Sequence, residues 1–212
     1  MRLYGTAGSP FVARVRIQIV AKSLPVEIVE PPGGIGSPQM LALSSLARIP
    51  VLETEEAIIP ESAVIQEFLE DRFPTPSLRG RTPVESARVR LLSRIVDLYL
   101  VPALQPLRAL RSGTDAADPE AARNGLDKAL GQLDAFLGPG LFAVAEELTL
   151  ADCAIALLMY YVDRLSSAVI PGFSRTHWRR LEACTPHMAS HPAVKQVLAL
   201  IESAVAAAKV AR

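Results

Sequence analysis

Two kinds of hydrophobic spacing divide the chain, and the change between them falls near residue 80. Before it, short apolar runs bounded by turn residues predict strands at Arg2–Gly5 and Val26–Glu30. Two further short strands are expected at Val51–Leu52 and Ala57–Ile59, joined through a polar turn into a hairpin. After residue 80, apolar residues recur only at helical spacing. The pattern predicts an α/β N-terminal part followed by an all-α part.

Serine and proline mark where the first helices should begin. Ser9-Pro10 and Ser37-Pro38 each place serine at an N-cap and proline at the first helical position. Pro50 cannot donate a ladder hydrogen bond, so we expect it to start the third strand. Ser62 is expected at the N-cap of the helix that follows the hairpin. The predicted order is β-α-β-α-β-β-α, which is a thioredoxin-like order.

The boundary between the two parts is rich in proline, glycine and charge. Residues 73–83 read FPTPSLRGRTP, a composition typical of an interdomain linker. We therefore expect one domain over residues 1–77 and an all-helical domain over residues 84–212.

The helical part should contain one long helix over residues 84–111, kinked at Pro102 and Pro106 because each removes an intrahelical hydrogen bond. Thr149 and Asp152 have the spacing of a capping box and predict another helix start. Further helices are expected at residues 119–137 and 193–209.

Composition narrows the class of protein. The 212 residues carry 22 basic and 22 acidic side chains, and a balanced charge does not indicate a nucleic-acid or membrane-surface binder. The N-terminus has no signal-peptide pattern, and the uncharged stretch Cys153–Val162 is too short to span a bilayer, so a cytoplasmic location is expected. Cys153 and Cys184 stand alone. His187 and His191 straddle a helix break and lack a third ligand, so no metal site is expected.

The starts of two predicted helices are candidate sites for chemistry, because a helix N-terminus offers unpaired N–H groups and a positive dipole end. Ser62 can give its hydroxyl and its N–H to a carboxylate, while Glu61 can hold an adjacent ammonium group. The pair would suit an α-amino acid. At the other start, Ser9 can donate to a thiol sulfur, and the alternative is an ordinary helix cap.

These stretches resemble the glutathione S-transferase superfamily. The residues from Leu46 to Leu69 match its VPxL and Glu-Ser pattern, and Ser9-Pro10-Phe11 followed by Arg14–Ile17 resembles the activating motif of its serine-type members, tau and zeta among them. Thr149-x-x-Asp152 resembles the hallmark of its C-terminal domain. The resemblance implies a thioredoxin-like domain, a helical domain, glutathione as cosubstrate and a homodimer.

The resemblance also implies roles for individual residues. The Ser9 hydroxyl would stabilise the glutathione thiolate, and Tyr4 is the competing activator. Phe11, Tyr99 and Arg164 would face the second substrate, although Arg164 can equally be a solvated arginine. Glutathione would be held by Ile49, across a cis peptide to Pro50, and by Arg48, Glu61, Ser62 and Gln105.

Three functions follow from the resemblance. The first is a transferase in which the glutathione thiolate attacks a small hydrophobic electrophile. The second is a zeta-like cis–trans isomerase acting on maleyl-type diacids, in which Arg164 grips a carboxylate. The third is a binding or assembly protein that has kept the fold, and Ser44-Ser45, where the family has Asn-Pro, leaves room for it.

Overall fold

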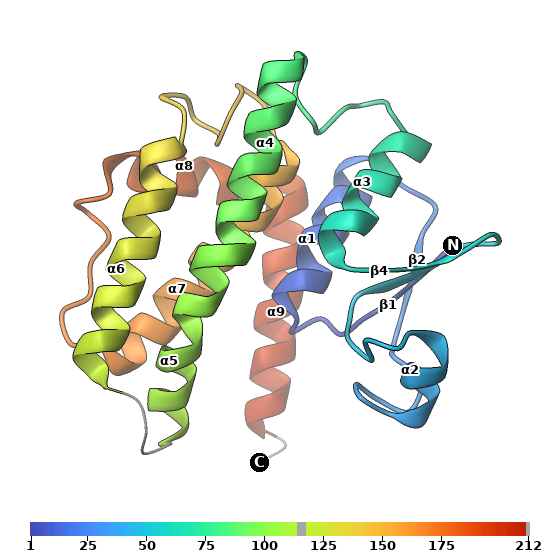
Figure 1. Cartoon of the computed structure of the whole chain (residues 1–212), viewed down its shortest axis with the longest axis horizontal. Coiled ribbons are helices and arrows are strands. Elements are labelled where there is room, and N and C mark those ends of the chain that lie inside the picture. Colours follow the sequence, from blue (N-terminus) through green and yellow to red (C-terminus); the bar gives the residue numbers. More distant parts are fainter. Residues whose placement is uncertain (114–117, 211–212) are drawn as a thin grey trace. The chain divides into compact units, whose positions relative to one another are not determined.

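The computed structural model describes residues 1–113 and 118–210 (Figure 1). Its internal contacts divide the chain into two units. The first unit contains Met1–Leu78 together with the segment from His191 onward, and the second contains Arg79–Ser190. Each unit has its own architecture.

The first unit is built on a four-stranded sheet in the order β2-β1-β3-β4. Strand β1 (Arg2–Tyr4) pairs in parallel with β2 (Glu27–Val29) and antiparallel with β3 (Val51–Glu53), which pairs antiparallel with β4 (Ile58–Pro60). The predicted strands and their order along the chain are therefore confirmed. Strand β3 begins one residue after Pro50, because proline has no N–H to give to the ladder.

Helices lie on both sides of this sheet, with α3 and α2 on opposite sides of the strands in Figure 1. Helix α9 packs against α1. Apolar side chains of α1 and α3 meet those of β1 and β3 in one buried cluster, formed by Leu3, Val12, Val15, Ile19, Leu52, Ile65 and Leu69. The helices of this unit are α1 (Pro10–Ala21), α2 (Pro38–Leu43), α3 (Ser62–Arg72) and α9 (Pro192–Val210).

Two of the three expected serine caps are confirmed. Ser9 accepts a hydrogen bond from the Val12 N–H at 3.4 Å, and Ser37 accepts one from the Met40 N–H at 3.1 Å. The prediction for Ser62 was wrong by one residue, since Glu61 occupies the N-cap position and Ser62 is the first residue of α3. Glu61 has φ +70°, which serine-type capping does not use, and its side chain makes no cap hydrogen bond.

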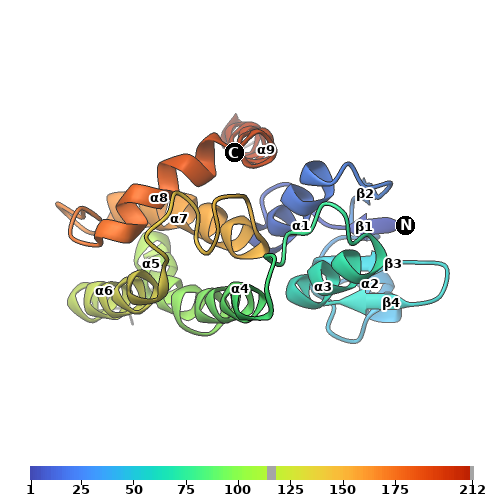
Figure 2. The same ribbon diagram turned by 90° about the horizontal axis from the view of Figure 1, so that it is seen from above.

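The second unit is all-helical, as predicted. Helix α7 packs against α4, α5 and α8, and Figure 2 shows these helices from above. The first ten residues of α7, 150–159, are all buried, and nine of them are hydrophobic while the tenth is an acid, Asp152. The elements are α4 (Pro83–Ile95), η1 (Val96–Leu100), α5 (Val101–Ser112), α6 (Pro119–Phe136), α7 (Leu150–Val169) and α8 (Arg179–Ser190).

The long helix expected over residues 84–111 is interrupted differently from the prediction. A π-helical turn, η1, separates α4 from α5, and the Val101 N–H bonds to the Val96 carbonyl five residues earlier. Pro102 directly follows this turn and has no N–H to donate to it, and Pro106 lies inside α5. The π-helical turn is therefore the interruption, and it lies just before the proline that cannot continue the α-helical hydrogen bonds. Helix α8, which contains Pro186, was not predicted.

The capping box at the start of α7 is confirmed. One oxygen of the Asp152 carboxylate accepts from the Thr149 N–H at 2.8 Å and from the Thr149 hydroxyl at 2.6 Å. The other oxygen accepts from the Ala143 N–H at 2.7 Å. Burial raises the pKa of Asp152 from 3.8 to about 6, and these hydrogen bonds act in the opposite direction. Within residues 1–113 and 118–210 there is no group of three or more His, Cys, Asp and Glu side chains that could hold a metal ion, and no helix is long and apolar enough to cross a membrane.

Candidate functional site

Three predicted site segments of the first unit come together at one end of its sheet. Tyr4, the last residue of β1, lies opposite Val51, the first residue of β3. Val51 in turn lies opposite Pro60, the last residue of β4. The segment from Gly5 to Ser9, the Ile49-Pro50 pair and the start of α3 therefore leave the same end of the sheet. The N-termini of α1 and α3 lie at that end.

The Ser9 hydroxyl is placed to donate a hydrogen bond to a ligand. Its oxygen accepts from the Val12 N–H, its backbone is extended, and its side chain is partly exposed. Among the residues that the structure describes, the Ser9 hydroxyl donates to no acceptor. Helix α1, with twelve residues, places its positive dipole end beside this hydroxyl. The arrangement can stabilise an anion, such as a thiolate.

Glu61 and Ser62 form the second part of this end. Glu61 is exposed, and Ser62 is 5% exposed at the first position of α3. The positive φ of Glu61 costs a non-glycine residue about 1–3 kcal/mol, and such conformations gather at functional sites. Glu61 is thus an exposed carboxylate residue directly before the unpaired N–H groups at the start of α3. A group carrying both an ammonium and a carboxylate finds complementary partners here.

The residues before β3 complete the site. The Ile49-Pro50 peptide is cis, which is the form implied by the resemblance. Ile49 is half-buried and Pro50 is buried. Arg48 is exposed, and within the described part of the chain its guanidinium makes no ion pair or side-chain hydrogen bond. It is available to a ligand carboxylate at this end of the sheet.

Tyr4, the competing activator, is engaged elsewhere. Its hydroxyl donates to the Glu53 carboxylate at 2.9 Å, and Glu53 lies opposite Arg2 at the far end of β1. That hydrogen bond raises the pKa of Tyr4, and partial burial adds to the effect. Tyr4 thus points away from the end that holds Ser9.

A buried polar seam joins α1 to α3, and sequence reasoning missed it. The Arg14 Nε donates to the Gln66 Oε1 at 3.1 Å, while the Gln66 Nε2 donates to the Arg14 carbonyl at 3.2 Å. Further along, the Gln18 Nε2 donates to the Gln66 carbonyl at 3.0 Å and to the Glu70 carboxylate at 2.9 Å. Both Gln18 partners are acceptors, which fixes the orientation of its amide.

The seam ends in a buried ion pair. The Lys22 ammonium lies 2.7 Å from the Glu70 carboxylate, and the two side chains are 0% and 1% exposed. The second Glu70 oxygen accepts from the Leu78 N–H at 3.0 Å. The polar residues recur every four positions, at 14 and 18 on α1, at 22 at its C-cap, and at 66 and 70 on α3. This i, i+4 repeat is the signal that could have revealed the seam.

The other predicted residues belong to the helical unit. Tyr99 on η1 is 50% exposed and lines a pocket of about 220 Å³ beside α6, together with Lys128 and Gln132. Gln105 is exposed on α5. Arg164 is exposed on α7, and its guanidinium carbon lies 5.6 Å from the ring centre of Tyr160. Phe11, by contrast, is half-buried in the first turn of α1.

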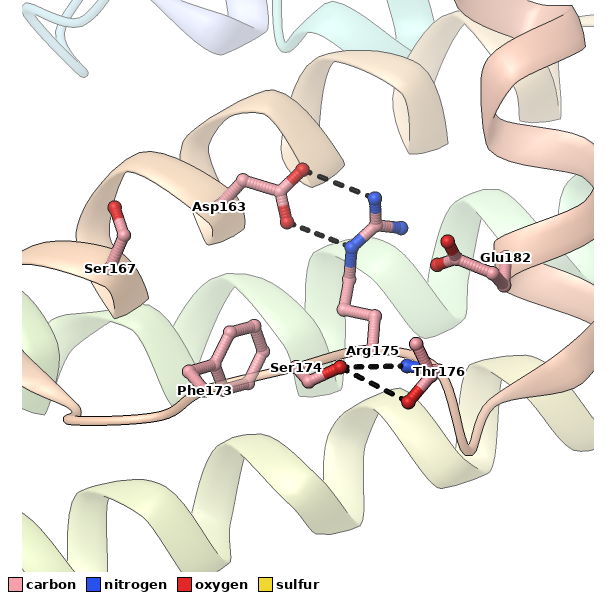
Figure 3. Close-up of a pocket in the computed structure, with 7 residues that line it drawn as sticks. All are labelled: Asp163, Ser167, Phe173, Ser174, Arg175, Thr176 and Glu182. Atoms are coloured by element: carbon pink, nitrogen blue, oxygen red, sulfur yellow. Dashed lines mark hydrogen bonds and ion pairs between the residues drawn. The ribbon is translucent and has the colours of Figure 1, made fainter.

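A second pocket of the helical unit is polar and separate from these residues (Figure 3). It has a volume of about 250 Å³ and is lined by residues of α7, α8 and the segment between them. The Arg175 Nε lies 2.8 Å from one Asp163 oxygen, and its NH2 donates to the other at 3.2 Å. Because this paired interaction already uses the charge of Arg175, the described residues that line the pocket offer no free cation to an anionic ligand.

The first unit is thus a thioredoxin-like domain with two helix N-termini at one end of its sheet, and the second is an all-helical domain. Comparison with known families agrees with this class. Residues 3–77 match the model of the glutathione S-transferase N-terminal domain, and residues 95–192 match that of the glutathione S-transferase C-terminal domain. Together these matches cover most of the chain. It belongs to the glutathione S-transferase superfamily.

Individual relatives carry different names. A maleylacetoacetate isomerase of Pseudomonas aeruginosa is 29% identical, over 92% of this chain and 94% of that protein. A stringent starvation protein A homolog of Coxiella burnetii is 28% identical, over 84% of each chain. The crystal structure of an Anaeromyxobacter dehalogenans maleylacetoacetate isomerase with bound glutathione has a TM-score of 0.73 and 26% identity, covering 92% of this chain and 93% of that one.

Proposed function

We propose that this protein binds glutathione at the sheet end formed by Ser9, Ile49-Pro50 and Glu61-Ser62, and that the bound thiolate attacks a small hydrophobic electrophile. The observation that carries the proposal is the convergence of two helix N-termini, one with a serine hydroxyl whose proton has no acceptor within the described residues. Family membership supports glutathione as the cosubstrate.

Each part of glutathione has a partner in this proposal. The γ-glutamyl carboxylate accepts from Ser62 and the N–H groups of α3, while the Glu61 carboxylate accepts from its ammonium group. The backbone of Ile49 pairs with the cysteinyl group, and Arg48 holds the glycyl carboxylate. These contacts place the sulfur at the start of α1, beside Ser9.

Ser9 acts on the thiol at the start of α1. Its hydroxyl donates to the sulfur, and the positive end of the helix favours the thiolate over the thiol. Thiol pKa values fall by roughly one to several units in such surroundings, which raises the thiolate fraction at neutral pH. The nucleophile belongs to glutathione, and Phe11, in the first turn of α1, contributes apolar surface for the electrophile.

Replacement of the Ser9 hydroxyl tests this proposal. Ser9→Ala should lower turnover with an aryl halide about 10- to 100-fold, with a smaller change in glutathione affinity, because the hydroxyl acts mainly on the anion. Ser37→Ala is the matched control, since Ser37 caps α2 in the same Ser-Pro context. Unchanged turnover in Ser9→Ala would refute the assignment of Ser9.

A second candidate is glutathione-dependent cis–trans isomerisation of a maleyl-type diacid. It is favoured by the Pseudomonas aeruginosa maleylacetoacetate isomerase, which matches almost the whole chain. In that reaction glutathione adds to the double bond, the bond rotates, and glutathione leaves unchanged. The exposed guanidinium of Arg164 would hold a substrate carboxylate. Arg164→Ala should then abolish diacid isomerisation and leave aryl-halide conjugation intact.

Calorimetric titration with glutathione separates these enzymes from a non-catalytic role. Saturable binding, weakened in a Glu61→Ala/Ser62→Ala variant, supports both enzymatic candidates. Lack of binding at millimolar glutathione would favour a binding or assembly protein, and the relative named stringent starvation protein A homolog bears a name that states no reaction. The same proposal includes a homodimer, which light scattering tests. It includes domain limits of 1–77 and 84–212, which limited proteolysis tests, and a cytoplasmic detoxification role.

A further inference from the structure

The seam between α1 and α3 contains one reciprocal link close to the candidate site. Gln66 uses both ends of its amide toward Arg14: its oxygen accepts from the side chain and its nitrogen donates to the backbone carbonyl. Arg14 is 1% exposed and Gln66 is 2% exposed. Because both groups are out of water, either one left unpaired would cost the full penalty of its desolvation. The link therefore holds one relative position of the two helices.

The place of this link along the helices connects it to the site. Arg14 lies four residues beyond Pro10, the first residue of α1, and Gln66 lies four residues beyond Ser62, the first residue of α3. Each is thus about one turn behind its helix start. The Gln18–Glu70 bond lies one further turn along both helices. The seam therefore runs in the same direction on α1 and α3, with its first link nearest to Ser9 and Ser62.

The backbone of α1 is itself part of the link. The Gln66 amide bonds to the carbonyl of Arg14, so it fixes the axis of α1 and not only a side chain. Gln18 returns a bond to the Gln66 carbonyl, which fixes the axis of α3 in the same way. The contact between the apolar side chains of α1 and α3, Val15 and Ile65 among them, has no preferred direction. The hydrogen bonds do have one, and they oppose sliding of one helix along the other.

We propose that Gln66 is a positioning residue that sets the distance between the N-termini of α1 and α3, and so lets one ligand reach both at once. This inference rests on the proposed function, in which the γ-glutamyl end binds at α3 and the sulfur lies at α1. A ligand held at both ends gains affinity only if their spacing matches its length. Gln66 touches neither end, and it acts through the two helices.

The test compares two ends of the same seam. Gln66→Met keeps the length of the side chain and removes both bonds to Arg14, whereas Glu70→Gln disturbs the distal ion pair with Lys22 and leaves Gln66 in place. Gln66→Glu retains an acceptor for the Arg14 Nε and serves as the conservative rescue. For each protein, calorimetry gives glutathione affinity, ultraviolet thiolate absorbance gives the pKa of the bound thiol, and urea unfolding gives stability.

Gln66→Met should bind glutathione about fivefold more weakly, because the two helix starts lose the spacing that lets one ligand reach both, and the pKa of its bound thiol should rise toward that of free glutathione. Gln66→Glu should recover part of both changes. Glu70→Gln should lower the urea midpoint while affinity and thiol pKa stay at the parent values. Equal affinity and equal thiol pKa in Gln66→Met and the parent would overturn the inference. If the parent itself binds no glutathione, the proposed function fails instead.

Discussion

Among the described residues, each unit buries one carboxylate on a helix, but the two carboxylates are stabilised by different means. Glu70, on α3 of the first unit, faces the Lys22 ammonium at 2.7 Å and also accepts from Gln18 and from the Leu78 N–H. Asp152, on α7 of the second unit, accepts three hydrogen bonds from Thr149 and Ala143. Their side chains are similarly buried.

The difference concerns charge compensation. Hydrogen bonds lower the pKa of Asp152, yet burial outweighs them and raises it to about 6. Three neutral donors thus do not offset the desolvation of one buried carboxylate, whereas Glu70 has a cation in contact. A cap organises the chain locally at an electrostatic cost, while the ion pair joins distant segments.

Removal of the cation is the largest expected effect. Lys22→Met leaves Glu70 buried without a counter-charge and should lower the free energy of unfolding by about 3–5 kcal/mol. Urea denaturation measures the loss. Lys22→Met/Glu70→Gln removes the stranded charge as well and should recover most of the stability. A double variant as unstable as the single one would show that the pair acts by geometry and not by charge.

Removal of the cap is the next effect in size. Asp152→Ala deprives the N–H groups of Ala143 and Thr149 of their acceptor and should cost about 2–3 kcal/mol. Part of the loss is returned because the buried charge disappears too. The matched control is Glu85→Ala in the exposed capping box of α4, where the carboxylate accepts from the Thr82 N–H at 3.3 Å. That variant should lose less than 1 kcal/mol. Equal losses at the two caps would contradict the role of burial.

The titration of Asp152 gives the most gradual effect, because it is spread over the pH range between the pKa values of its unfolded and folded states. Its pKa in the folded protein, about 6, lies above the ordinary value of 3.8, so between these values the folded state binds more protons than the unfolded state. The contribution of Asp152 to stability is therefore fully present below about pH 4 and is lost as pH rises toward 6, by at most ~1.4 kcal/mol per pH unit. Unfolding of the parent and of Asp152→Asn, compared from pH 4 to 7, should reveal this slope in their difference. A flat difference would show that hydrogen bonding keeps the carboxylate ionised throughout.

Local signals in the sequence predicted much of the fold. Ser9 and Ser37 before proline marked true helix starts, and Thr149 with Asp152 marked another, because caps depend on a few neighbouring residues. Ser62 was predicted to be the N-cap of α3, but it is the first helical residue, so the helix begins one residue earlier than expected. The reason is that Glu61 adopts a positive φ, and nothing in the residue type of glutamate indicates that conformation.

The site was only partly accessible to sequence reasoning. Short motifs located Ser9 and Glu61-Ser62, but the contact between Arg14 and Gln66 joins residues 52 positions apart and depends on how α1 and α3 pack. Arg14 was noted as part of a motif, and its burial against Gln66 was not foreseen. Arginine is rarely fully buried, so its residue type alone does not predict a buried contact. Such a contact depends on how the two helices pack in the tertiary structure.

The π-helical turn at Val96–Leu100 has a consequence for comparing sequences. Each residue advances an α-helix by about 100°, so one extra residue in a turn rotates everything after it relative to what precedes it. Buried residues of α4, such as Leu92, and of α5, such as Leu104 and Leu107, therefore follow two separate heptad phases. A relative with an uninterrupted helix should align with this chain only after a one-residue gap within Val96–Leu100. Without that gap, core positions of α5 would be matched to surface positions.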